Sequence, residues 1–233
     1  MDVDPLYINF TSGSTGVPKG VTVSHRSVLD FIPQFAAIFG IKAQDILGNQ
    51  APFDFDVSVK DLYTALYTGA KVQIIACLFQ PAHQADGLSG RSCGHNAGLG
   101  CQRDVFCLDH ERFRLPRATA IRQVLFSGEV MPIKHLNKWK VALPQARFVN
   151  LYGPTEITCN CTYYILPDRV FAPEEVLPIG HAFPNEKVFL LDENDRLVTE
   201  PGQTGELCVS GTALALATTP TRPARRRPSP KIR

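Results

Sequence analysis

The chain has 233 residues, of which 44% are hydrophobic and 20% are charged, and this composition excludes collagen-like, coiled-coil and wholly disordered classes. No apolar run is long enough to cross a membrane, and the N-terminus lacks a secretory leader, so we expect a cytoplasmic protein without a membrane partner. The net charge is +2, but residues 217–233 carry six basic side chains and no acidic one. The rest of the chain is therefore mildly acidic, which argues against nucleic acid as a partner.

The first part of the chain predicts alternating strands and helices. Short aromatic and β-branched runs predict strands over residues 6–10 and 21–23. Ser24 stands where the N-cap of a helix would be, Gly40 stands where that helix would end, and Pro33 predicts a kink inside it. Its apolar residues recur at spacings of three and four: Val28, Phe31, Ile32, Phe35, Ile38 and Phe39. Residues 58–68 predict a second helix, stopped by Gly69, and residues 71–75 predict the next strand.

The second part continues the alternation and then becomes rich in strands. Residues 124–126 and 148–151 predict strands on either side of an amphipathic helix over 132–143. Residues 187–191 predict a strand that enters a turn, and residues 206–210 predict another. Strands that alternate with helices and are followed by a strand-rich block predict an α/β fold with mixed sheets packed against helices.

Two segments break this pattern. Residues 77–117 hold four of the seven cysteines and three of the six histidines, and they show no helical or strand period. We favour a reading frame lost near residue 77 and regained near 118, because a structureless loop of this length is improbable in a compact domain. The alternative is a zinc site made of Cys93, His95, Cys101, Cys107 and His110. By composition, residues 217–233 predict a disordered basic tail, where the frame is lost again.

The loop at residues 11–20, Thr-Ser-Gly-Ser-Thr-Gly-Val-Pro-Lys-Gly, has the chemistry of a phosphate-binding loop. Its hydroxyl groups can donate hydrogen bonds, its glycines let backbone N–H groups point inward, and Lys19 adds a cation. The spacing differs from the common P-loop. A mobile surface loop is the alternative interpretation for such a segment standing alone.

Two more loops whose side chains could bind a ligand follow predicted strands. Residues 150–156 read Asn-Leu-Tyr-Gly-Pro-Thr-Glu, in which Tyr152 could stack on a base, Thr155 could donate to a phosphate and Glu156 could hold a divalent cation. Ser127, Gly128 and Glu129 follow the strand at 124–126. Three such loops at strand ends predict a ligand crevice at the edge of an α/β sheet.

These residues resemble the adenylate-forming superfamily, specifically the amino-acid adenylation domains of nonribosomal peptide synthetases. Residues 7–21 with the continuation at 23–26 resemble its phosphate-loop signature, and residues 150–156 resemble its adenine and magnesium signature. Residues 202–211 resemble the next signature, and residues 55–58 resemble the motif that opens the amino-acid pocket. The resemblance implies a partial AMP-binding domain over residues 5–216, a fragment of the family's large N-terminal domain.

What the resemblance implies is a two-step ligase. With ATP and Mg²⁺, a carboxylate substrate such as an amino acid becomes an acyl-AMP, and pyrophosphate is released. The acyl group then passes to a thiol, usually the phosphopantetheine arm of a carrier domain. Asp56 favours an amino acid over a fatty acid, because a carboxylate suits an ammonium group.

The resemblance also implies a role for each matching residue. The nucleotide would be bound by Thr11, Ser12, Gly13, Ser14, Thr15, Gly16, Lys19, Gly128, Glu129, Asn150, Tyr152 and Gly153. Thr155 would contact the α-phosphate, Glu156 would ligate Mg²⁺, and both would be catalytic. Asp56 would pair with the substrate's α-amino group, although a helix N-cap is the alternative interpretation. The side-chain pocket would be lined by Val57, Lys60, Val124, Phe126, Leu151 and Cys159, for which core packing is the alternative.

Other interpretations stay open at this point. The family's ribose-binding Tyr-x-x-Gly-Asp motif and its C-terminal domain with a catalytic lysine have no counterpart in the sequence, so we expect slow or absent turnover. A non-catalytic nucleotide-binding remnant or gene fragment is one alternative. A D-alanine–carrier ligase or acyl-CoA synthetase relative is another. Cys159 and Cys161 alternate on an expected strand and are interpreted as packed thiols.

Overall fold

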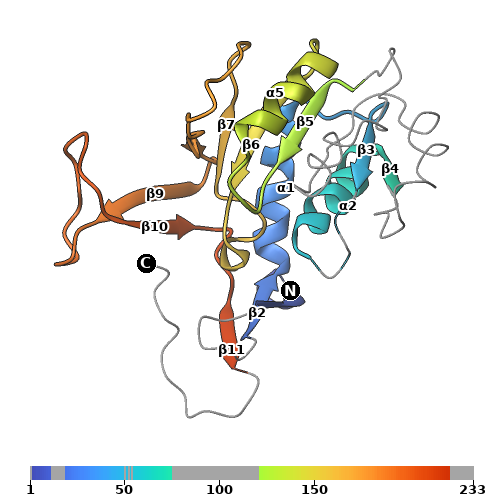
Figure 1. Cartoon of the computed structure of the whole chain (residues 1–233). Coiled ribbons are helices and arrows are strands. Elements are labelled where there is room, and N and C mark those ends of the chain that lie inside the picture. Colours follow the sequence, from blue (N-terminus) through green and yellow to red (C-terminus); the bar gives the residue numbers. More distant parts are fainter. Residues whose placement is uncertain are drawn as a thin grey trace.

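The computed structural model describes residues 2–11, 19–49, 51, 53, 55–74 and 121–220. It is an α/β fold with mixed sheets and packed helices, as the sequence predicts (Figure 1). Residues 77–117 and the predicted tail beyond residue 220 lie outside the described residues. The reading-frame and zinc interpretations of those segments therefore stay predictions.

The first sheet is built around β2 (Lys19–Ser24). β1 (Pro5–Thr11) pairs with one edge of β2 and β11 (Ala217–Pro220) with the other, both antiparallel. Because β2 is central, its Val21 and Val23 are completely buried. The predicted start of the tail at residue 217 is too early, since the first residues of that segment pair through their backbone with β2, and composition does not reveal such pairing.

The helix α1 (His25–Phe39) forms where the sequence predicts it. The Ser24 hydroxyl accepts a hydrogen bond from the Ser27 N–H at 3.1 Å and so satisfies a free donor of the first turn. Gly40 ends the helix at φ +61°, a left-handed conformation that glycine adopts without steric cost. Pro33 lies inside the helix. The predicted apolar stripe is buried through Val28, Phe31, Ile32, Phe35 and Phe39.

A parallel pair of strands follows along the chain. β3 (Ile46–Asn49) pairs with β4 (Lys71–Ile74), and α2 (Val57–Thr68) connects them and packs against α1. The prediction of α2 and its stop at Gly69 is confirmed. The short β3 was not predicted, because its four residues contain only two apolar side chains.

The second half of the chain forms a four-stranded sheet. Its strands, in spatial order, are β5 (Gln123–Phe126), β6 (Arg147–Tyr152), β7 (Thr162–Ile165) and β8 (His181–Ala182). β5 and β6 are parallel and are connected by α5 (Ile133–Ala142), whereas β7 and β8 pair antiparallel. The connection from β6 to β7 contains the short 3₁₀ helix η3 (Thr155–Ile157).

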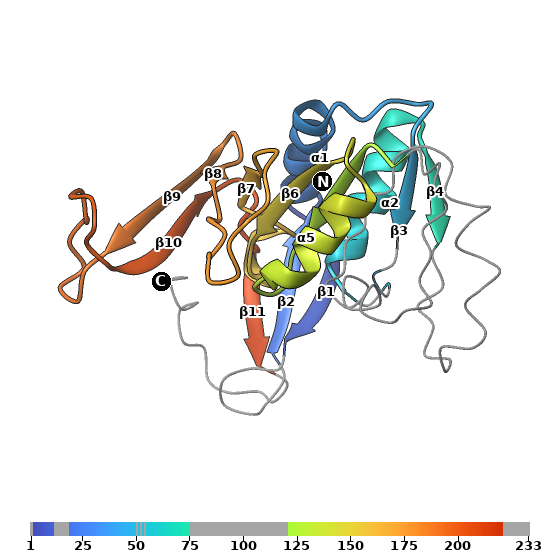
Figure 2. The ribbon, with the colours of Figure 1, turned by 45° about the horizontal axis from the view of Figure 1, so that its top comes forward.

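β5 and β6 lie between two helices and therefore have two buried faces. Leu125, Val149 and Leu151 pack in one cluster with the aromatic residues of α1. The alternate strand residues Val124, Phe126 and Phe148 pack in a second cluster with α5. Figure 2 shows α5 crossing the sheet, with α1 behind it. This double burial explains why residues 124–126 of β5 form a continuous apolar run rather than an alternating one.

β9 (Glu186–Leu191) and β10 (Glu206–Gly211) form an antiparallel hairpin, as two predicted strands anticipate. The hairpin extends away from the layered part of the molecule (Figures 1 and 2). Within the described ranges, no helix is long and apolar enough to cross a bilayer.

Candidate active site

Asp56 stands at the start of α2 with its side chain buried. It occupies the N-cap position, but its carboxylate makes no capping hydrogen bond to the helix. The residue is only 9% exposed, and burial raises the pKa of the carboxyl group. The nearby Lys60 charge and a hydrogen bond with the Thr155 side chain partly offset this rise. Groups of the β6–β7 connection therefore act on the Asp56 carboxylate, together with the Val57 N–H at the start of α2.

Thr155 and Glu156 approach Asp56 from η3. The Thr155 side chain lies near enough to the Asp56 carboxylate to lower its pKa, and the Glu156 charge lies near enough to raise it. η3 also packs against β2, the strand that follows the predicted phosphate loop. The motif around Asp56 and the motif around Glu156, which are far apart in the sequence, thus lie close together. Both lie near the strand that follows the predicted phosphate loop.

The turn after η3 has an unusual backbone. Thr158 and Cys159 have φ of +52° and +70°, a left-handed conformation that is unfavourable for side chains other than glycine. The Thr158 hydroxyl donates to the Ala213 carbonyl at 2.6 Å, and the Cys159 thiol donates to the Asp56 carbonyl at 3.1 Å. These contacts hold the turn in place. As a result, Cys159 lies against the start of α2.

The two neighbouring cysteines are packed thiols. Burial raises the pKa of Cys159, the nearby Asp56 charge raises it further, and burial raises the pKa of Cys161 to about 12. Both therefore stay protonated at neutral pH, and the prediction of packed thiols is confirmed. The expected strand around them is wrong, because the left-handed turn delays β7 until Thr162.

Lys60 lies one helical turn after Asp56. It is 1% exposed, and its Nζ has no hydrogen-bond partner among the described residues. Its charge acts on both Asp56 and Cys159. The next residue, Asp61, is also buried, and burial raises its pKa to about 7. Charged groups that are this deeply buried are costly unless they are paired.

The predicted pocket residues separate into two groups. Leu151 packs in the same cluster as Cys159, and Val57 opens α2 next to Asp56. Val124 and Phe126 instead pack against α5, in the cluster on the other face of the sheet. The residue of β5 that joins Leu151 and Cys159 is Leu125. The prediction is one residue out of step here, and because side chains alternate along a strand, a shift of one residue moves them to the opposite face.

The residues at the strand ends are partly accessible. Gly128 and Glu129 are exposed after β5, and Tyr152, which is 38% exposed, ends β6. The Asn150 side chain donates to the Pro178 carbonyl at 2.9 Å, so it fixes a neighbouring loop. Gly153 has backbone atoms so close that a Cβ would lie 2.5 Å from the Asn160 Cα. It therefore shapes the turn that carries Thr155 and Glu156.

Only the base of the predicted phosphate loop is described. Thr11 and Lys19 face each other as the last pair of the β1–β2 ladder, so the loop between them closes a hairpin. The other predicted members lie outside the described residues: Ser12, Gly13, Ser14, Thr15 and Gly16.

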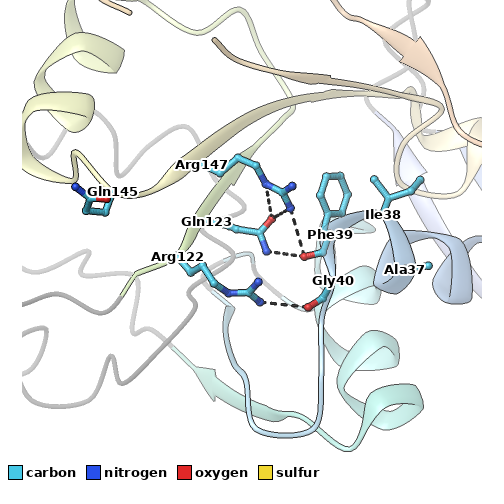
Figure 3. Close-up of a pocket in the computed structure, with 8 residues that line it drawn as sticks. All are labelled: Ala37, Ile38, Phe39, Gly40, Arg122, Gln123, Gln145 and Arg147. Carbon is cyan, nitrogen blue, oxygen red and sulfur yellow. Dashed lines mark hydrogen bonds between the residues drawn. The ribbon is translucent and has the colours of Figure 1, made fainter. Parts of the chain in front are cut away.

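A separate hollow lies at the C-terminal end of α1 and contains none of the predicted site residues (Figure 3). Gln123 donates to the Phe39 carbonyl at 2.7 Å, and Arg122 donates to the Gly40 carbonyl at 3.3 Å. Arg147 donates to Phe39 as well and hydrogen-bonds Gln123. These donors satisfy carbonyls at the negative end of the helix dipole. Their arrangement is that of a structural helix cap.

Comparison with known proteins identifies the family. The family model for the AMP-binding enzyme matches residues 2–217, which is most of the chain. The chain belongs to the AMP-binding enzyme family. The resemblance that the four sequence motifs indicate is therefore confirmed, and so is the fold that it implies.

Similar proteins include adenylating ligases that serve carrier proteins. An L-proline–[L-prolyl-carrier protein] ligase of Streptomyces coelicolor is 35% identical over 87% of this chain and 38% of its own length. A D-alanine–D-alanyl carrier protein ligase of Bacillus licheniformis is 30% identical over 91% of this chain and 42% of its own. The chain spans about two fifths of the length of these relatives.

A solved adenylation domain has the same fold. The crystal structure of the Vibrio cholerae adenylation domain AlmE in complex with glycyl-adenosine-5'-phosphate is 28% identical, with a TM-score of 0.80. The match covers 94% of this chain and 41% of that one.

The residues around Asp56 can be compared with the groups that a magnesium nucleotide would need. Among the described residues no three His, Cys, Asp or Glu side chains form a metal-binding group. Mg²⁺ usually takes only one or two carboxylates together with phosphate oxygens. The half-buried Glu156, beside Asp56, fits that pattern, and the partly exposed Tyr152 ring is accessible for an adenine to stack on.

Three further residues join this neighbourhood without having been predicted. Asn160 is buried beside Cys159, and its Oδ1 has no partner within the described part of the chain. Tyr7 lies close to Asp56 and Cys159, and its hydroxyl also lacks a partner there. Leu125 is the third. No signal in the sequence singles out Leu125, because Val124, Leu125 and Phe126 are all apolar, and the burial of Asn160 follows the left-handed turn before it.

Proposed function

We propose that this domain activates an amino acid with ATP and Mg²⁺, forming an aminoacyl-AMP and pyrophosphate. The observation that carries the proposal is the convergence of Asp56 with Thr155 and Glu156. The Asp56 carboxylate is suited to an α-ammonium group. The Thr155 hydroxyl and the Glu156 carboxylate are suited to a magnesium-bound phosphate, and they lie near Asp56. Membership of the AMP-binding family supports the same reaction.

In the proposed reaction, a carboxylate oxygen of the amino acid attacks the α-phosphorus of ATP. The bond from the α-phosphorus to the bridging oxygen breaks, and pyrophosphate leaves with that electron pair. Negative charge grows on the oxygens around the α-phosphorus, so hydrogen-bond donors and cations there stabilise the transition state. Thr155 would donate a hydrogen bond to such an oxygen, and the Lys19 cation would stabilise the charge of the leaving pyrophosphate.

Each remaining residue would bind or orient. Asp56 would accept hydrogen bonds from the α-ammonium group and so fix the carboxylate of the substrate in line for attack. Tyr152 would stack on adenine. Glu156 would hold Mg²⁺, which supplies charge neutralisation to the phosphates when it is bound.

We further propose that the acyl group passes to the phosphopantetheine thiol of a carrier domain. The names of the proline and D-alanine relatives, both carrier protein ligases, support this step. In it the thiol sulfur attacks the acyl carbon, AMP leaves, and a thioester forms. Such a partner and its substrate would occur in the cytoplasm.

The test measures two quantities on the full chain, MgATP affinity and amino-acid-dependent exchange of pyrophosphate into ATP. We expect MgATP to bind and Glu156→Gln to weaken that binding about tenfold or more, because a charged ligand of the metal is lost. Asp56→Asn should leave MgATP affinity unchanged while raising the amino-acid concentration for half-maximal exchange about thirtyfold or more. Glu193→Gln, in the exposed turn after β9, is the matched control.

The outcomes separate the competing functions. Exchange that depends on an amino acid and on Asp56 supports the ligase. MgATP binding without exchange for any amino acid indicates a non-catalytic nucleotide-binding domain. Absence of MgATP binding by the folded chain contradicts both.

A further inference from the structure

The buried face of α2 is unusually polar. Asp56, Lys60 and Thr64 follow one another at intervals of four residues, so they line up on one side of the helix. All three are buried. A helix in a globular protein normally places apolar residues on this face. Its polar composition indicates that the face meets a polar ligand and not only a core.

Of these residues, Lys60 has the largest free-energy cost of burial. The side chain is almost completely buried, and its ammonium group has no hydrogen-bond partner among the described residues. An ammonium group removed from water is strongly destabilising unless an anion neutralises it. The anion has to come either from the protein or from a bound molecule.

The nearby protein carboxylates supply it only in part. The Lys60 charge acts on both Asp56 and Asp61, but no hydrogen bond or ion pair joins Lys60 to either of them among the described contacts. Asp61 is the next residue of the helix, and consecutive helical side chains point about 100° apart. Asp61 also holds its proton up to a pKa of about 7, so it carries only part of a charge at neutral pH. Asp56 is the partner proposed for the substrate's α-ammonium group.

Charge balance then defines the missing group. An amino acid brings one ammonium group, which Asp56 neutralises, and one α-carboxylate, which goes to the reacting phosphate. A second carboxylate on the substrate would neutralise Lys60. Lys60 and Asp56 both lie next to Cys159, so the two charges belong to one neighbourhood of the site.

We propose that Lys60 determines specificity by binding a side-chain carboxylate, so that the substrate of this domain is an acidic amino acid. This inference rests on the proposed function, because it uses the same site. It separates the chain from the proline and D-alanine ligases to which it is similar, since neither of the amino acids in their names has a charged side chain.

The first test uses the unaltered full chain and stable analogues of the aminoacyl-AMP. Sulfamoyladenosines carrying L-glutamate, L-aspartate, L-glutamine, L-asparagine, D-alanine or L-proline are compared by calorimetry. We expect one acidic analogue to bind about thirtyfold or more tightly than its own amide. Equal or weaker binding of both acidic analogues relative to their amides would overturn the proposal.

The second test removes the charge. Lys60→Met keeps an unbranched side chain, and replacing a buried charge by an apolar group of similar size is commonly tolerated by the fold. The variant should lose the preference for the acidic analogue, to within about threefold of the amide, whereas Lys60→Arg should retain part of it. Lys187→Met, on the exposed side of β9, should behave as the unaltered chain does.

Plain sulfamoyladenosine without an amino acid separates the two levels of failure. If it and MgATP bind but acidic analogues have no advantage, only the specificity inference is wrong. If neither binds to the folded chain, the proposed function fails and the inference fails with it. A preference for acidic analogues that survives in Lys60→Met would show that another residue binds the carboxylate, which also overturns the inference.

Discussion

Glu186 shows how a single buried carboxylate joins three parts of this molecule. One of its oxygens accepts a hydrogen bond from the Ala213 N–H at 2.9 Å, and the other has no partner among the described residues. Asp30 of α1 lies close by and hydrogen-bonds both Thr212 and Asn185. Burial, together with the charge of Asp30, raises the pKa of Glu186 from 4.5 to about 7.

This raised pKa predicts a pH-dependent contribution to stability. Between pH 4.5 and about 7 the folded chain holds a proton on Glu186 that the unfolded chain releases. Because the folded state binds more protons in this interval, the free energy of unfolding falls as the pH rises through it. Glu186→Gln should therefore be more stable than the unaltered chain at pH 8, by about 3 kcal/mol, and similar to it at pH 4.

Urea unfolding at several pH values measures this difference. Asp61 contributes a fall in the same direction in both proteins, so the difference between them isolates Glu186. Glu193→Gln, an exposed carboxylate in the turn after β9, should change neither the size nor the pH dependence of the unfolding free energy. A difference between Glu186→Gln and the unaltered chain that is the same at pH 4 and pH 8 would contradict the pKa.

At the scale of an element, the β6–β7 connection is the part of the fold that builds the site. Its two arms approach so closely that the Cys161 backbone N–H donates to the Tyr152 carbonyl at 2.8 Å. Gly153 lies at the crossing, where the backbone of residues 159–161 leaves no room for a Cβ. The position of Thr155, Glu156 and Cys159 therefore depends on a residue that has no side chain.

Gly153→Ala tests this dependence. The added methyl group would meet backbone atoms that cannot rotate away, so we expect a loss of about 2 kcal/mol or more in unfolding free energy. Because the loop must shift, MgATP affinity should also fall, by about tenfold or more. Both quantities are measurable on the purified chain, by urea unfolding and by calorimetry.

Gly202→Ala is the matched comparison. Gly202 has φ +85° but open space around it, so alanine adds backbone strain of about 1 kcal/mol and no collision. The MgATP affinity of Gly202→Ala should be unchanged, since Gly202 lies in the turn that leads to β10 and not in the β6–β7 connection. If both glycine variants lose nucleotide affinity equally, the close approach at Gly153 is not what positions the site.

At the scale of the whole molecule, the layers differ in how deeply their residues are buried. β5 and β6 lie between α1 and α5, and every residue of β5 is buried. The β9–β10 hairpin has only two strands, most residues of β9 are exposed or half-buried, and the hairpin extends outward (Figure 1). A two-stranded hairpin is marginal by itself in water.

Hydrogen exchange followed by mass spectrometry should reflect these layers. We expect amides of β5, β6 and α1 to exchange slowest, through global unfolding, and amides of β9 and β10 to exchange at least about tenfold faster, through local opening. Equal protection of the hairpin and the central layer would show that the hairpin is as strongly held as the core.

The sequence by itself determined the family and most of the elements. The stripe of α1, its Ser24 cap and its Gly40 end follow from local periodicity and local hydrogen bonding, which nearest neighbours in the chain decide. The motif around Asp56 and the one around Glu156 are readable for a similar reason, because their chemistry resides in residue type and short spacing. Those local signals need no knowledge of the rest of the fold.

Only the tertiary structure decided which of these residues meet, and on which face. Thr155 lies near Asp56 because the Cys159 thiol holds the turn after η3 against the Asp56 carbonyl. Leu125, and not Val124 or Phe126, shares a cluster with Cys159, and a strand with two buried faces has no polar side to reveal its register. The strand β11 depends on backbone pairing with distant β2, and the inward position of Cys159 depends on a turn held by Ala213 and Asp56. Contacts between distant segments set these features, so no local pattern could encode them.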